Sequence, residues 1–198
     1  MFHHTRKIAA ALGLLGLAGC RAFDPALLAP TPETLPARLP PLAAEVRLPH
    51  FFVSRDSQTV ATDVRTLFGR EVREVLVDSS GTPQGFAVLT ARRVRYGTGP
   101  VYSYISGLAF GGMNLLGFPF ARYRCAVDLQ LDVRNQRREL VGTYYAQEQA
   151  TATAGFYSRA NYAQPERVLY LQCVRQGLTQ IRAQLQPEIP RLREELAP

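Results

Sequence analysis

The residues that could do chemistry in this 198-residue chain are few and far apart. Lys7 is the only lysine, and His50 is the only histidine outside the N-terminal segment 1–19. A general base, a Schiff-base amine or an imidazole metal site needs such side chains. The sequence contains no phosphate-binding loop and no HExxH or CxxC pattern. We therefore predict a protein that is not an enzyme, with no catalytic residue, no metal site and no cofactor.

Two acidic residues, Asp128 and Asp132, share one face of a predicted strand. Four residues along a strand place them about 13 Å apart, which is too far for the two carboxyl groups of a glycosidase. We interpret this pair as part of a solvated sheet face.

Cys125 and Cys173 could form a disulfide, which an oxidising compartment permits. Cys125 lies on the apolar face of its predicted strand, but Cys173 is about 120° around its helix from the middle of the apolar seam. Two buried thiols are therefore the favoured alternative, and the disulfide remains open.

The N-terminus has the composition of a targeting signal. Met1–Lys7 is basic, and Ile8–Leu17 is apolar, too short to span a bilayer but long enough for a signal-peptide core. The next residues, Leu17-Ala18-Gly19-Cys20, resemble the lipobox of bacterial lipoproteins. This resemblance implies a signal peptide over 1–19, attachment of lipid, including palmitate, to Cys20, and membrane anchoring by several acyl chains.

The residue after the cysteine bears on sorting. In lipoproteins of the enterobacterial type an aspartate there retains the protein in the inner membrane, and this chain has Arg21. The resemblance therefore implies the outer membrane, with the domain facing the periplasm.

Residues 20–49 are rich in proline, which blocks helix and favours an extended chain. We predict a tether between the lipid and the domain. The alternative is that its later part folds back onto the domain through its apolar residues, which are Leu35, Leu39, Leu42, Val46 and Leu48.

Hydrophobic periodicity predicts one α+β domain over residues 50–186. The expected elements are a helix over 57–75, strands over 85–96, 123–133 and 139–149, and a long helix over 165–185. Gly69 lies inside the first predicted helix, and Glu71 falls on its apolar face. Both residues weaken the prediction of a continuous helix, and a break near Gly69 is the alternative. Pro187 and Pro190 should stop the last helix, which leaves 187–198 as a loose tail.

These elements predict a two-layer domain in which an N-terminal helix and a long C-terminal helix pack on a small, mostly antiparallel sheet. This order of elements, with the apolar stretch 108–119 before the strand pair, resembles a broad set of envelope lipoproteins. It is also similar to domains of the TolB amino-terminal and curli-secretion-channel type.

No charged residue occurs between Arg95 and Arg122. This charge-free stretch is interpreted as a buried strand and turn, as a membrane or partner contact, or as the wall of an oligomeric pore. In the second case Arg92, Arg93, Arg95, Arg122 and Arg124 would meet anionic headgroups at its base. The candidate contact residues are Tyr102, Tyr104, Leu108, Phe110, Met113, Leu115, Leu116 and Phe118.

The formal net charge of +7 comes from scattered arginines, which argues against nucleic-acid binding. The leading hypothesis is a lipid-anchored, non-enzymatic binding or assembly module that docks an unknown envelope protein or the membrane. The alternative is a subunit of an oligomeric channel or secretion complex, which would make the protein a homo-oligomer.

Overall fold

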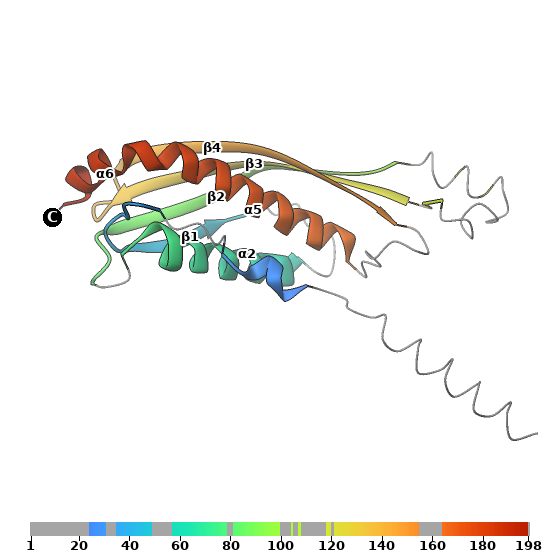
Figure 1. Cartoon of the computed structure of the whole chain (residues 1–198), viewed down its shortest axis with the longest axis horizontal. Helices are drawn as coiled ribbons and strands as arrows, with labels where there is room; N and C mark the ends of the chain where they lie inside the picture. The colour runs from blue at the N-terminus through green and yellow to red at the C-terminus, as the bar shows by residue number, and fades with distance from the viewer. Residues whose placement is uncertain are drawn as a thin grey trace, which may run out of the picture.

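The fold is taken from a computed structural model that describes residues 24–30, 35–48, 57–78, 81–99, 104, 107, 118–119, 121–154 and 164–197. Four strands form one sheet in the order β1-β2-β3-β4. They are β1 (Leu42–Arg47), β2 (Gly85–Thr98), β3 (Ala121–Asn135) and β4 (Leu140–Ala154). β1 runs parallel to β2, and the other pairs are antiparallel. Helices α2 (Ser57–Glu71) and α5 (Pro165–Leu185) cover one face of the sheet (Figure 1), which confirms the predicted two-layer α+β fold.

β3 shows how the sequence separates the two faces of the sheet. Its alternate residues Cys125, Val127, Leu129, Leu131 and Val133 are all buried under the helices. The residues between them point to the outer face, because side chains alternate along a strand. On β4 the same rule buries Tyr144 and exposes Tyr145.

The proline-rich segment is not a tether over its whole length. Leu35, Leu39 and Leu42 are buried in the core, and β1 adds a parallel strand to the sheet. Both backbone polar groups of Leu39 form hydrogen bonds. Its N–H donates to the Leu76 carbonyl, and its carbonyl accepts from the Asp78 N–H, each at 2.9 Å. The predicted boundaries at 49 and 50 are therefore wrong, and the fold-back alternative is correct because these apolar side chains gain burial.

The C-terminal tail is also folded. Residues 186–188 form the turn η3 (Gln186–Glu188), and α6 (Ile189–Leu196) follows directly. Pro187 and Pro190 lie in the first turns of these elements, where a missing N–H removes no helical hydrogen bond. Ile189, Leu192 and Leu196 are buried, so the prediction of a loose tail is wrong.

The first helix continues through Gly69, and the break considered there does not occur. It ends in a π-helical turn, η2 (Val72–Leu76). Glu71 does fall on the apolar face, and it is buried beside Arg182 of α5, with an ion-pair contact of 3.6 Å. The negative charge of Glu71, which interrupts the apolar pattern of the first helix, is thus balanced by the positive charge of Arg182 on α5.

β4 is an edge strand, and side chains guard part of its open edge. The Gln184 Nε2 donates to the Tyr145 carbonyl at 2.7 Å, and the Tyr145 N–H donates to the Gln184 Oε1 at 3.4 Å. Nearby, Arg191 donates to the Val141 carbonyl at 3.3 Å. Such cover hinders the pairing of an edge strand with another chain.

Replacing Gln184 with alanine is expected to release the Tyr145 backbone groups and increase self-association through this edge. The loss of the two bonds should lower the free energy of unfolding by about 1 kcal/mol. Sedimentation at rising protein concentration measures the first effect, with Gln180→Ala, exposed on the same helix, as the control. Equal self-association of the two variants would contradict this function of Gln184.

Candidate functional site

The structure places only part of the predicted contact surface. Tyr104 is 72% exposed and Phe118 is half-buried. Cys20 and the other six contact residues, Tyr102, Leu108, Phe110, Met113, Leu115 and Leu116, lie outside the described residues. Their functions remain predictions.

The structure brings the two predicted cysteines together as buried free thiols. The Cys173 Sγ lies 3.5 Å from the Cys125 carbonyl oxygen. The angular argument against their proximity is wrong because α5 buries a broader face than its heptad seam, including Val168, Leu169 and Gly177. A hydrogen bond with Cys173 and burial raise the pKa of Cys125, so this thiol is neutral at physiological pH. A disulfide stays the alternative to these two thiols.

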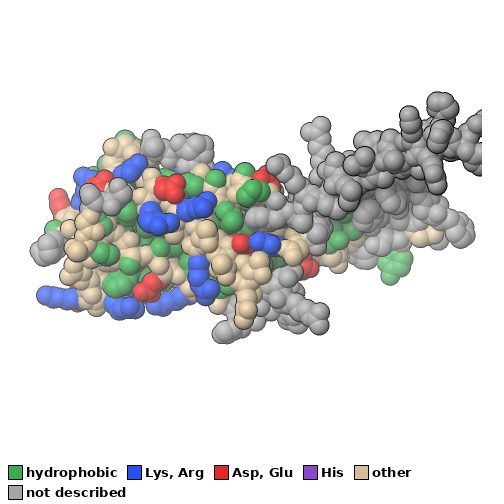
Figure 2. Space-filling model, turned by 90° about the horizontal axis from the view of Figure 1, so that it is seen from below, with side chains coloured by type: hydrophobic (Ala, Val, Ile, Leu, Met, Phe, Trp, Pro, Cys, Tyr) green, Lys and Arg blue, Asp and Glu red, His purple; other side chains and the backbone are tan. Residues whose placement is uncertain are grey.

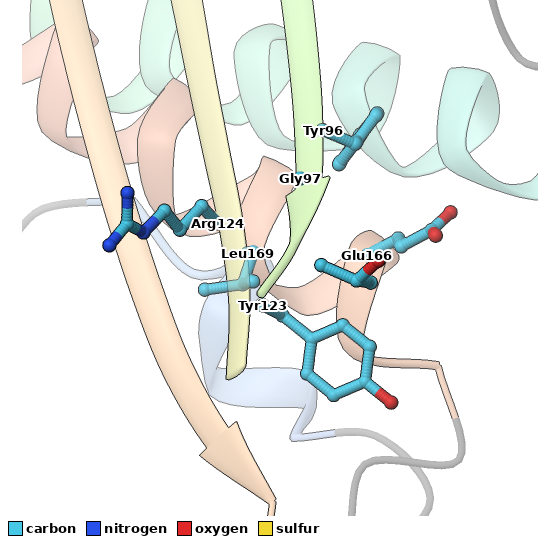
Figure 3. A pocket seen from close by; sticks show the side chains of 7 residues that line it. Tyr96, Gly97, Tyr123, Arg124, Glu166 and Leu169 are labelled. Atoms are coloured by element: carbon cyan, nitrogen blue, oxygen red, sulfur yellow. The ribbon is translucent and has the colours of Figure 1, made fainter. Parts of the chain in front are cut away.

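A small pocket opens at the distal end of the domain, by which we mean the end where β2 finishes at Thr98 and β3 begins at Ala121. Its volume is about 170 Å³. It is lined by Tyr96, Gly97, Thr98, Tyr123, Arg124, Glu166 and Leu169. Figure 3 shows the Tyr123 ring and the Glu166 carboxyl on one side of the strands and the Arg124 guanidinium on the other. Glu166 comes from the first turn of α5, which places this turn at the distal end.

The side chains of this pocket suit binding better than proton transfer. Burial raises the pKa of Tyr96, and the neighbouring Cys125 adds to the effect. Burial likewise raises the pKa of Tyr170, which lies beside the two thiols. Neutral phenols of this kind donate and accept hydrogen bonds but are poor bases at neutral pH. Sequence analysis missed this pocket because its residues come from three separate elements, none of which carries a motif.

A β-bulge places the arginines of β2 on the outer face of the sheet. Ala91 pairs with Leu129 and Arg93 with Asp128, so Arg92 is an extra residue in β2. Strict alternation after Ala91 would turn Arg93 and Arg95 toward the core. The bulge resets the register, so that Val94 and Tyr96 face the buried side opposite Val127 and Cys125. The same shift turns Arg93 and Arg95 outward.

Arg122 and Arg124 lie on the same outer face of β3, next to the end of β2. We call Arg92, Arg93, Arg95, Arg122 and Arg124 the arginine cluster. The Arg92 guanidinium lies 5.4 Å from the centre of the Tyr145 ring. The structure therefore brings together the five arginines that the sequence analysis grouped.

The arginine cluster differs in its charge environment from six arginines elsewhere in the domain. Arg134, Arg138, Arg167, Arg182, Arg191 and Arg193 each form an ion pair with a carboxylate. On the one face that Figure 2 shows, several positive side chains lie next to negative ones. Within the described ranges, no member of the cluster forms an ion pair. The cluster thus carries five positive charges, and in the register of β2 and β3 only the Asp128 carboxylate faces them.

Asp132 is not a solvated residue, contrary to the sequence-based interpretation. It is 7% exposed and accepts hydrogen bonds from Gln130 at 2.6 Å, Arg134 at 3.1 Å and Thr143 at 3.1 Å. Burial acts to raise the pKa of the carboxyl, but these bonds and the charge of Arg134 outweigh it and lower the pKa below its ordinary value. Asp132 therefore links β3 to β4 as a carboxylate.

Replacing Asp132 with asparagine is expected to lower the free energy of unfolding by about 2 kcal/mol at neutral pH. Because the pKa of Asp132 is lower in the folded than in the unfolded chain, its stabilisation is complete above about pH 4. It is lost as the pH falls through the folded-state pKa. Urea unfolding of parent and variant from pH 7 to pH 2 should show their stabilities converging in acid. Asp128→Asn, on the same face of β3, should remain within about 0.5 kcal/mol of the parent at each pH.

The described part of the chain contains no cluster of three His, Cys, Asp or Glu residues that could hold a metal ion. No helix in the described ranges is long and apolar enough to cross a membrane.

Comparison with solved structures gives similar proteins at low sequence identity. A minor lipoprotein from Acinetobacter baumannii has 10% identity and a TM-score of 0.33, and the match covers 78% of this chain and 95% of that chain. A Xanthomonas campestris protein of the DUF330 family has 12% identity and a TM-score of 0.36, with 81% and 94% covered. A dodecameric PelC variant from Paraburkholderia phytofirmans has 12% identity and a TM-score of 0.34, with 75% and 92% covered. No family model and no curated protein matches the sequence.

Proposed function

We propose that this chain is a lipid-anchored protein of the bacterial cell envelope whose domain acts as a non-enzymatic binding or assembly module. The observation that carries the proposal is Leu17-Ala18-Gly19-Cys20, directly after a basic segment and an apolar segment of signal-peptide length. Acylated Cys20 would hold the domain at a membrane without a transmembrane helix. Arg21 favours the outer membrane, with the domain in the periplasm.

The binding function is supported by the environment of the acidic and thiol side chains, which are held in structural contacts or buried. Asp132 is held by three hydrogen-bond donors, and Glu71 is buried against Arg182. Cys125 is buried as a neutral thiol. By contrast, the arginine cluster and the distal pocket remain accessible, and both suit recognition of a partner.

Metabolic labelling with a fatty acid tests the anchor. The full chain is expected to incorporate label, and Cys20→Ser should abolish incorporation. The matched control is Cys125→Ala/Cys173→Ala, which keeps Cys20 and should remain labelled. Label on the Cys20→Ser chain, or none on the parent, would contradict the proposal. Arg21→Asp should move the labelled protein from the outer to the inner membrane fraction.

A second candidate is a subunit of an oligomeric channel or secretion complex. One feature favours it: no described side chain covers the edge of β4 over 147–153, whereas Gln184 and Arg191 cover the edge at Tyr145 and Val141. An uncovered edge can pair with a strand of a second copy. Sedimentation of detergent-extracted protein distinguishes the candidates, because a channel subunit must remain oligomeric.

A further inference from the structure

The distal end of the domain combines the arginine cluster with proximity to the expected anchor. We propose that this end docks onto the anionic phospholipid headgroups of the bilayer that holds Cys20. The inference rests on the proposed function, because the anchor determines which surfaces can reach the bilayer.

The anchor is short. Only residues 21–23 separate Cys20 from Asp24, where the described structure begins. Asp24 caps the turn η1 (Pro25–Leu28), accepting from the Ala26 N–H at 3.0 Å. The turn is bound to the helix layer (Figure 1), since Arg175 donates to the Ala26 carbonyl at 3.2 Å and Arg70 to the Leu28 carbonyl at 3.4 Å. Four extended residues span at most about 14 Å, so the bilayer must lie within that distance of Asp24.

This reach matches the distance from η1 to the distal end. Arg175 contacts η1, and Glu166, nine residues earlier in α5, lines the distal pocket. An α-helix rises 1.5 Å per residue, so these two levels are about 13 Å apart. The acylated cysteine can therefore reach the level of the distal pocket, which Arg124 also lines. The turn between β3 and β4 lies at the opposite end of these two strands.

The charge of the distal end selects an anionic surface. Arg93 and Arg95 form one column on β2, and Arg122 and Arg124 form a second on β3. Neighbours within a column are about 7 Å apart, close enough for mutual repulsion. The connection between Arg95 and Arg122 contains no acidic residue that could neutralise them. Asp128 is the one acid that faces the cluster in the register of β2 and β3.

Guanidinium groups bind phosphate oxygens through paired hydrogen bonds, which suits phospholipid headgroups. Because the cluster lies on two neighbouring strands, several of its guanidinium groups can contact phosphates of one membrane surface. Each basic residue near an anionic membrane surface strengthens binding about fivefold. Loss of two members of the cluster should therefore weaken binding about 25-fold.

Vesicle sedimentation tests the arginines without the lipid anchor. The sample is the chain from residue 20 with Cys20→Ser, which keeps every described residue and hence the whole core. It is expected to bind vesicles of phosphatidylcholine with 30% phosphatidylglycerol, and to release them as salt rises. Arg93→Gln/Arg95→Gln should weaken this binding about 25-fold. The control Arg73→Gln/Arg137→Gln removes the same charge from two exposed positions outside the cluster and should bind like the parent.

Absence of binding to the anionic vesicles, or equal loss in the two double variants, would overturn the proposal. The first result would leave an acidic protein as the partner of the cluster. These results do not depend on acylation, so failure of the fatty-acid labelling would reject the proposed anchor separately.

Tryptophan quenching tests the orientation of the acylated protein, because the chain has no tryptophan of its own. Thr98→Trp places a reporter at the distal end, and Arg137→Trp places one at the turn between β3 and β4. In vesicles containing a lipid with a quencher at its headgroup, the first reporter should be strongly quenched and the second should not. Equal quenching of both reporters would overturn the proposed orientation.

Discussion

Replacement of Arg182 by leucine is expected to lower the free energy of unfolding by about 3–5 kcal/mol. Arg182 is 4% exposed and Glu71 is 1% exposed, and their ion-pair contact of 3.6 Å joins the two helices of the helix layer. Leucine fills much of the volume of the arginine but removes the positive charge from beside the buried Glu71 carboxylate. Unfolding by urea, followed by circular dichroism, measures the loss.

The double variant Glu71→Leu/Arg182→Leu separates the ion pair from packing. Because this variant removes both charges of the pair, its stability should return to within about 1 kcal/mol of the parent or exceed it. A double variant as unstable as Arg182→Leu would show that the arginine acts through its packing, and the electrostatic explanation would then be wrong.

Gly85→Ala is expected to destabilise the domain by about 3 kcal/mol. Gly85 is buried at the start of β2, and an added Cβ would overlap the backbone carbonyl of Arg134. It would also approach the Leu196 side chain to 3.2 Å. Backbone atoms within a paired sheet cannot move aside as a side chain can, so β2 and β3 would have to separate locally. Thermal and urea unfolding measure this effect.

Gly69→Ala is the matched control for that substitution. It lies inside α2, where an added Cβ would meet no atom within 4 Å. Alanine is the better helix former, so this variant should be more stable than the parent by about 1 kcal/mol. If both glycine variants shifted stability in the same direction, steric overlap at Gly85 would not be the cause.

The main elements of the fold were predictable because they bury one regular face. The alternation in β3 and the apolar spacing in α5 each indicated their structure without tertiary information. The segment 35–48 was harder, because proline argues locally for an extended chain while Leu39 and Leu42 gain burial only once β2 and η2 are in place. The tail was missed because a proline that ends one helix can begin the next.

The sequence predicted which arginines belong to the candidate site but not where they lie in the fold. Sequence analysis grouped the five arginines by their closeness to a charge-free stretch, but it could not place Arg93 and Arg95 on the outer face. That placement depends on a single extra residue in β2, which shows only in the pairing with β3. The hydrogen bonds that hold Asp132 were likewise not predictable. Two of the donors are Arg134 and Thr143, and Thr143 lies on β4, which is not adjacent to Asp132 in the sequence.

The contacts of α6 determine when the domain can finish folding. Arg193 donates to the Arg38 carbonyl at 2.6 Å, and Leu192 and Leu196 complete the core beside the first residues of β2. The segment before β1 and helix α6 thus depend on each other, because the core is complete only when both are in place.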